Sequence, residues 1–377
     1  MRTKLAAELG LEFPIFAFTH CRDVVAAVSN AGGLGVLGVA GRSLEELAIE
    51  LEWIEKQVGD RPYGVDLLLP VKFVGSQEGG FDVAQLDARI PEAHRRFLDG
   101  LLEKHGVPPL PPGTPVGGEL GVGFERQRDV LDLCFRHRIR LIASALGPPP
   151  ADMIEQARAK GVKVAALAGT VEHAMRHVEA GVDLVVAQGY EAGGHTGEIS
   201  TLVLVPEVVD AVAPVPVLAA GGIANGRQLT AALALGAQGV WTGSVWLTTE
   251  EAETHPVVKE KFLRASSRDT VRSRSVTGKP ARQLRTAWTE AWDDPANPTP
   301  PLPMPLQPRL VREAQLRIAR SAHKSPGAEQ LINYFVGQVV GSMKHIRPAR
   351  RVIEEMAQEY ADTMERLDAW AEGSGED

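Results

Sequence analysis

Short apolar runs alternate with helix-length amphipathic stretches along most of the chain. Runs that are apolar at nearly every position are typical of strands buried on both faces, as in a parallel sheet. We predict eight such strands: Phe13–Phe18, Leu34–Val39, Tyr63–Leu69, Leu141–Ala145, Val162–Leu167, Leu184–Gln188, Val217–Ala220 and Gly239–Thr242. The pattern therefore predicts an α/β fold of the (β/α)8 TIM-barrel type. An open doubly wound sheet is the alternative, and it explains the strand count less well.

Helical spacing fills the segments between these strands. Ser43 is expected to cap a helix that runs to about Gln57, because Glu46 stands three residues later and completes a capping box. The other predicted barrel helices are Arg22–Asn30, Arg126–Arg136, Ala151–Lys160, Val171–Glu179, Val205–Val212 and Gly226–Leu235.

Two regions do not follow the alternation. Residues 71–124 are rich in Gly and Pro, so we interpret them as an insertion after the third strand that forms a lid and contains a helix near Ile90–Lys104. Residues 251–377 are expected to form a mostly helical C-terminal extension, packed on the barrel, with helices at Val311–Ala322 and Pro348–Trp370. Residues 1–70 and 125–250 would then form the barrel itself.

Composition narrows the classes of partner. The 377 residues carry a formal net charge of −8, which argues against a nucleic-acid partner. The chain has two cysteines, too few for a disulfide framework, and no apolar run long enough for a membrane span or a signal peptide. We expect a cytoplasmic protein that acts on a small molecule, with a homodimer as its candidate oligomeric state, and we assign no metal ligands.

Glycine-rich segments follow three of the predicted strands, at the end of the barrel where such enzymes place their sites. The sixth strand is followed by a segment ending in His195–Gly197, the seventh by Gly221-Gly222, and the eighth by Gly243-Ser244. Glycines can simply turn the chain. Two such sites on adjacent strands favour phosphate binding, because exposed backbone N–H groups there can approach the phosphate oxygens.

His195 stands between glycines in what we interpret as a flexible loop. A histidine with a pKa near neutrality suits proton transfer at a carbon next to an electron-withdrawing group. The residues alone leave open whether it does this or only hydrogen-bonds a cofactor or the loop.

The segments AAVSNAGGLGVLG (Ala26–Gly38), AGGHTG (Ala192–Gly197) and VLAAGGIANGRQLTAALALGAQGVWTGS (Val217–Ser244) resemble the nitronate monooxygenase (2-nitropropane dioxygenase) family. The resemblance covers nearly the whole chain apart from the insertion. GGHTGE followed by TLVLVPEVVDAV also resembles the related FMN-dependent enoyl-ACP reductases.

The resemblance implies one bound FMN and oxidation of alkyl nitronates with O2. It implies His195 as the catalytic residue and a phosphate site at the two glycine pairs. The cofactor contacts implied by matching positions are Ser144, Gln188, Gly193, Gly194, Gly221, Gly222, Gly243 and Ser244.

Two segments depart from the family pattern. Where relatives have APMAG after the first strand, this chain has Ala17–Arg22, which places His20 and Cys21 on the substrate side of the flavin. Where relatives have Gly-Val-Asn at the third strand, this chain has Gly64-Val65-Asp66, so a carboxylate is expected near the flavin ring.

Two other functions remain as alternatives. One is an enoyl-ACP reductase that uses NAD(P)H, although the sequence shows no NADH site. The other is an FMN-binding sensor or storage protein without catalysis.

Overall fold

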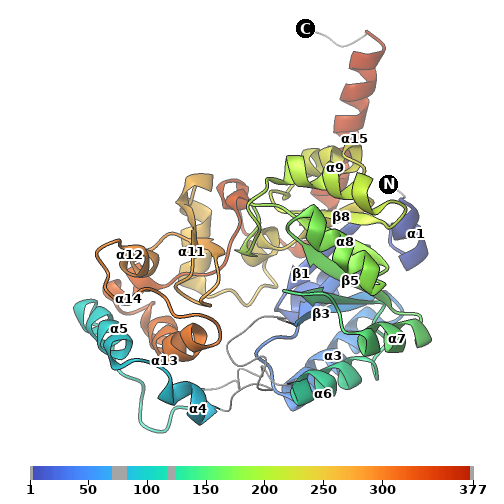
Figure 1. Ribbon diagram of the computed structural model, residues 1–377. Helices are drawn as coiled ribbons and strands as arrows, with labels where there is room; N and C mark the ends of the chain where they lie inside the picture. The colour runs from blue at the N-terminus through green and yellow to red at the C-terminus, as the bar shows by residue number, and fades with distance from the viewer. Residues whose placement is uncertain (1–2, 70–82, 117–123, 374–377) are drawn as a thin grey trace.

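The computed structural model describes residues 3–69, 83–116 and 124–373, and a closed parallel barrel stands at its centre (Figure 1). The barrel strands, in their order around it, are β1 (Ile15–Thr19), β2 (Leu34–Gly38), β3 (Tyr63–Leu68), β4 (Leu141–Ala145), β5 (Lys163–Ala168), β6 (Leu184–Gln188), β8 (Val217–Ala220) and β9 (Gly239–Thr242). The last strand pairs with the first, Ile15 lying opposite Val240, which closes the sheet. The predicted TIM barrel is confirmed, and the open sheet is excluded.

The barrel interior is filled by side chains from alternate strand positions, such as Phe16, Val36 and Val186, all fully buried. A short N-terminal helix, α1 (Lys4–Leu9), adds Leu5 and Leu9 to the same cluster. This packing fills the barrel below the C-terminal ends of its strands, so the space for a ligand lies at those ends.

Helices cover the outside of the barrel and alternate with its strands. They are α2 (Arg22–Asn30), α3 (Leu44–Val58), α6 (Phe124–Cys134), α7 (Ala151–Ala159), α8 (Val171–Ala180), α9 (Thr201–Val212) and α10 (Gly226–Ala234). The capping box predicted for α3 is confirmed, because the Ser43 hydroxyl accepts from Glu46 N and the Glu46 carboxylate accepts from Ser43 N. Helix α9 begins four residues before its predicted start, because Glu191 reaches across to accept from Thr201 N.

A second lobe stands beside the barrel, at the left of Figure 1. Its elements are η2 (Ser244–Thr248), α11 (Pro256–Arg264), η3 (Ser267–Asp269), β10 (Thr270–Ser273), β11 (Ala281–Leu284), α12 (Ala287–Asp293), α13 (Leu306–Ser321), α14 (Pro326–Leu331) and η4 (Gln338–Ser342). The C-terminal region is therefore not only helical. β11 pairs with β10 and with a two-residue strand, β7 (Gly194–His195), to form a small antiparallel sheet.

The described part of the insertion packs against this second lobe. Helices α4 (Val83–Ala88) and α5 (Glu92–Lys104) both contact α13. Arg309 donates two hydrogen bonds to the Asp87 carboxylate, at 2.8 and 2.6 Å. The Phe97 ring lies edge-on to Trp292, with their centroids 4.8 Å apart. Helices α4 and α5 therefore stabilise the second lobe. The rest of the lid expected from the sequence, in residues 70–82 and 117–123, lies outside the described residues.

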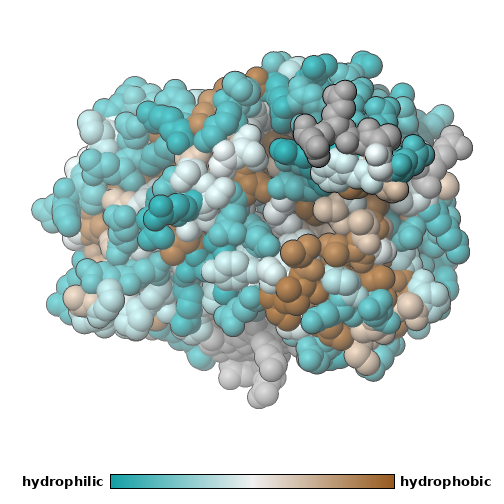
Figure 2. All heavy atoms as spheres, turned by 90° about the horizontal axis from the view of Figure 1, so that it is seen from above, coloured by the Kyte–Doolittle hydropathy of each residue, from teal (hydrophilic) through white to brown (hydrophobic). Residues whose placement is uncertain are grey.

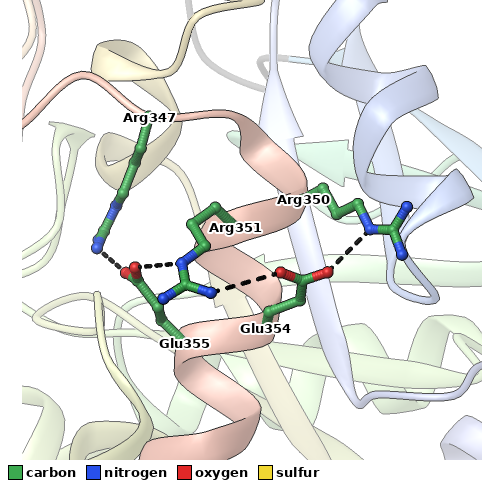
Figure 3. A network of polar contacts seen from close by, with 5 residues as sticks. All are labelled: Arg347, Arg350, Arg351, Glu354 and Glu355. Carbon is green, nitrogen blue, oxygen red and sulfur yellow. Dashed lines mark hydrogen bonds and ion pairs between the residues drawn. The ribbon is translucent and has the colours of Figure 1, made fainter.

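The last helix, α15 (Ala349–Ala371), packs on α10 and α2 and projects beyond the body of the molecule (Figure 1). Pro348 gives it no side-chain cap, and the Glu251 carboxylate from another segment accepts from Ala349 N instead. Its first turns carry the arginine–glutamate network of Figure 3, formed by Arg347, Arg350, Arg351, Glu354 and Glu355. Because these pairs are largely exposed, packing against the barrel contributes more to the stability of the helix than the network does.

The surface in Figure 2, which looks down on the face where α9 lies in Figure 1, is mostly hydrophilic and has a broad apolar area to the right of centre. Exposed apolar side chains of α9 and α8 include Leu202, Val203 and Met175. Within the described residues, no helix combines the length and apolar character needed to cross a bilayer. The structure is of one chain, so the expected homodimer stays a prediction.

Candidate active site

A cavity of about 840 Å3 opens at the C-terminal ends of the barrel strands. Its walls come from the barrel loops and from the second lobe, which contributes Thr277, Lys279, Tyr334 and Phe335. The cavity falls within the size range of sites for cofactors and drug-sized ligands. Most of the residues singled out from the sequence line it, namely His20, Asp66, Gln188, Gly193, Gly194, His195, Gly221, Gly222, Gly243 and Ser244.

The two glycine pairs lie together on one wall, after β8 and β9. Gly221 and Gly222 have φ values of +98° and +72°, a region in which other residues are strained. A Cβ built on Gly221 would lie 3.0 Å from Thr201 Oγ1, so this backbone also packs closely on the start of α9. A Cβ on Gly243 would meet nothing closer than 3.8 Å, so its missing side chain leaves room on the cavity side.

Ser244 completes this wall at the beginning of η2. Its Oγ accepts a hydrogen bond from Gly337 N at 2.8 Å, which leaves the hydroxyl proton free to donate to a ligand. Behind it, the buried Trp246 indole donates to Thr242 O and so holds η2 against the barrel. Glycines in the left-handed region and a hydroxyl that can donate are features of phosphate sites, and the phosphate site at this wall stays a prediction.

His195 lies in β7 and not in a flexible loop, because its backbone pairs with Ala281 of β11. Its Nε2 lies 2.9 Å from Thr277 Oγ1, and its Nδ1 makes no hydrogen bond to another described residue. Burial, together with the positive charge of Lys279, lowers the pKa of His195 to about 4. The expectation of a pKa near neutrality is therefore wrong, and the imidazole is neutral at pH 7.

Asp66 is 6% exposed and lies at the wall formed by β2, β3 and β4. Its Oδ2 is buried without a hydrogen-bond partner among the described residues. Burial raises the pKa of Asp66 to about 8. The charged carboxylate expected from the sequence is thus a neutral carboxyl group at pH 7, which can donate one hydrogen bond and accept others.

Two predicted site residues lie outside the cavity lining. The Ser144 side chain is fully buried and donates to Gly147 O at 2.8 Å. Cys21 precedes α2, and its thiol turns away from the cavity to donate to Glu251 O at 3.1 Å. Cys21 could in principle share a metal ion with Asp23 and Glu253, whose ligand atoms lie within 4.8 Å. Burial raises the pKa of Cys21, so the thiol stays protonated and is a poor ligand.

Sequence reasoning missed two groups of lining residues. One face of α8, which follows β5 directly, lines the cavity with His173, Arg176 and His177. Their spacing of three and four residues places them on one side of the helix, and it could have identified them from the sequence. Thr277 and Lys279 lie in the loop between β10 and β11, about eighty residues after His195, and no pattern in the sequence links the two segments.

Known proteins resemble this chain over almost its whole length. The family model described as nitronate monooxygenase matches residues 5–359. A Mycobacterium tuberculosis protein, provisionally named a monooxygenase, is 61% identical over 97% of this chain and 98% of its own length. A Staphylococcus saprophyticus protein, provisionally named a nitronate monooxygenase, is 28% identical over 97% of this chain and 99% of its own.

Solved structures also resemble this chain over almost its whole length. Nitroalkane oxidase from Streptomyces ansochromogenes superposes with a TM-score of 0.78 at 26% identity, covering 96% of this chain and 99% of its own. FabK from Thermotoga maritima superposes with a TM-score of 0.71 at 28% identity, covering 98% of this chain and 99% of its own.

Proposed function

Since the chain belongs to the nitronate monooxygenase family, we propose that it is an FMN-dependent oxidoreductase that oxidises alkyl nitronates with O2. One observation carries the proposal. The two glycine pairs with Ser244 (Gly221, Gly222, Gly243 and Ser244) and a neutral histidine, His195, line the same cavity. Bound flavin would supply the electron acceptor that none of these side chains can provide.

The chain's own residues would bind and orient both ligands. The glycine wall and Ser244 would hold the phosphate, and Gln188 offers an amide that can donate to or accept from the ring. Asp66, protonated at neutral pH, can donate a hydrogen bond as an asparagine amide does. This similarity explains how an acidic residue can occupy a position where the resembled family has an amide.

His195 would accept the α-proton when the substrate is a neutral nitroalkane. Its neutral ring can take a proton on Nδ1, while Thr277 fixes the orientation of the ring through Nε2. A pKa of about 4 makes it a weak base, so substrates that have already lost their α-proton suit this site better than neutral nitroalkanes. The low pKa of His195 thus supports nitronates as the better substrates.

The first test is the identity of the cofactor. The purified protein should be yellow and should release FMN, not FAD, on denaturation. A colourless protein that cannot be reconstituted with FMN would remove the basis of the proposal.

The second test separates the two enzymatic alternatives by anaerobic stopped-flow reduction of the flavin. Reduction by an alkyl nitronate, followed by reoxidation with O2, supports the oxygenase. The likeness to FabK keeps the reductase as a second candidate. Reduction by NADH or NADPH with no response to nitronates would favour it, and no reduction by either would favour a sensor or storage protein.

A further inference from the structure

Lys279 extends from the second lobe into the wall of the cavity, close enough to His195 for its charge to lower the pKa of that histidine. The side chain is partly buried, and burial lowers the pKa of its own ammonium group. A partly desolvated cation beside the residue that would meet the substrate is a binding feature unless a counter-ion within the protein satisfies it.

The backbone around Lys279 is firmly held. Its N–H donates to Thr277 Oγ1, and Gly278 N donates to Arg274 O at 2.9 Å. Gly278 has a φ of +77°, and a Cβ there would lie 2.3 Å from Leu302 O. The pairing of Ala281 with His195 then fixes this loop relative to the histidine. The backbone from which the Lys279 side chain extends is therefore held in place beside His195.

No carboxylate of the described chain satisfies this ammonium, which forms neither an ion pair nor a side-chain hydrogen bond there. Two carboxyl groups line the cavity. Glu191 accepts from the backbone and hydroxyl of Thr201, and Asp66 is neutral at pH 7. Within the described residues, Lys279 is therefore a cation at the cavity wall without a partner of opposite charge, and a bound anion would supply that charge.

The predicted phosphate site is a separate wall, built from backbone and Ser244. Within the described cavity lining, Arg176 is the other permanent cation, and its Nε donates to Glu172 O in its own helix. Arg176 is exposed at the surface of α8, whereas Lys279 is tied to the loop that holds His195. Lys279 is thus the better placed of the two to contact a small substrate beside the histidine.

We propose that Lys279 Nζ binds the anionic oxygen of the substrate. This inference rests on the proposed function and names the group that recognises the substrate charge. A charge-assisted hydrogen bond of this kind contributes roughly 10- to 100-fold to affinity.

Nitrate is a suitable probe, because it is a small planar oxyanion that cannot be oxidised by the enzyme. Its dissociation constant would be measured on the oxidised holoenzyme from the change in flavin absorbance, which needs no turnover. We expect Lys279→Met to weaken nitrate binding roughly 10- to 100-fold and Lys279→Arg to restore most of it. Arg176→Met, which removes the other cavity cation, should change it less than twofold.

Steady-state kinetics give the second measurement. Lys279→Met should raise KM for a nitronate by a similar factor, with a smaller change in kcat and unchanged flavin content. Equal nitrate affinity in the wild type and Lys279→Met would overturn the inference. An equal loss of nitrate affinity in Arg176→Met would also overturn the inference. The loss would then come from the overall positive potential of the cavity and not from one contact with Lys279.

The inference and the proposed function fail in different ways. Nitrate binding that depends on Lys279 in a protein that does not oxidise nitronates would refute the function and support the anion site. Nitronate oxidation with an unchanged KM in Lys279→Met would support the function and refute the anion site.

Discussion

Asp66→Asn should make the stability of the apoprotein less dependent on pH. The buried carboxyl has a pKa of about 8 in the folded protein, against an ordinary value of 3.8. Between these two values the unfolded chain releases the proton while the folded protein keeps it. The unfolded state then binds fewer protons, so this group makes the folded protein less stable as the pH rises, and the loss is complete above about pH 8.

The size of the effect follows from the same two values. Each pH unit in this window costs about 1.4 kcal/mol, because one proton separates the folded and unfolded states. Near pH 8 the folded group also begins to ionise, so the change from pH 6 to pH 8 is about 2 kcal/mol. Asparagine has nearly the same shape as aspartic acid and does not titrate. The Asp66→Asn variant should therefore not lose this stability between pH 6 and pH 8.

Urea unfolding of the two apoproteins at pH 6 and pH 8 measures the difference. We expect the stability of Asp66→Asn relative to the wild type to increase by about 2 kcal/mol between these pH values. Asp210→Asn, at an exposed position of α9, is the matched control for loss of one acidic group, and its difference from the wild type should stay constant. A constant difference for Asp66→Asn as well would show that Asp66 does not keep its proton in the folded protein.

Three further predictions concern the site and its support. His195→Asn should keep FMN but lose roughly 100-fold or more in turnover of neutral nitroalkanes, with a smaller loss on preformed nitronates, in parallel assays of the two substrates; equal rates on both would remove the histidine from the mechanism. Gly221→Ala should lower the flavin-to-protein absorbance ratio, because the position has a φ of +98° and little space, whereas Gly41→Ala, with a φ of +84° and open surroundings, should not. Phe97→Ala should destabilise the protein by about 2 kcal/mol in thermal unfolding through its lost contact with Trp292, and unchanged stability would contradict the packing role of the insertion.

Much of the barrel could be predicted because its strands carry a strong local signal. Short runs that are apolar at nearly every position are typical of strands buried on both faces of a sheet, and the predicted bounds of these strands agree with the structure to within two residues. The glycine wall was predictable for a similar reason, since Gly221-Gly222 and Gly243-Ser244 directly follow two such strands.

The rest of the site depends on contacts that are distant in sequence. Strand β7 has two residues and exists because β11 pairs with it, so no local pattern could reveal it. The low pKa of His195 comes from burial and from Lys279, neither of which is visible in the residues around the histidine. His20 and Cys21 are adjacent in sequence, yet only His20 lines the cavity, because Cys21 turns toward Glu251 at the start of α2.

The second lobe combines helices of the insertion with helices of the C-terminal region, and this affects how the protein can fold during synthesis on the ribosome. Helix α5 packs on α13, and Phe97 packs on Trp292. Roughly two hundred residues separate these two aromatic side chains in the sequence, and a ribosome adds that many in about 10–40 s. During that interval most of the barrel strands can emerge and pair, while the apolar face of α5 has no partner. We expect the nascent chain to expose this apolar face for tens of seconds, until α13 and Trp292 have been synthesised.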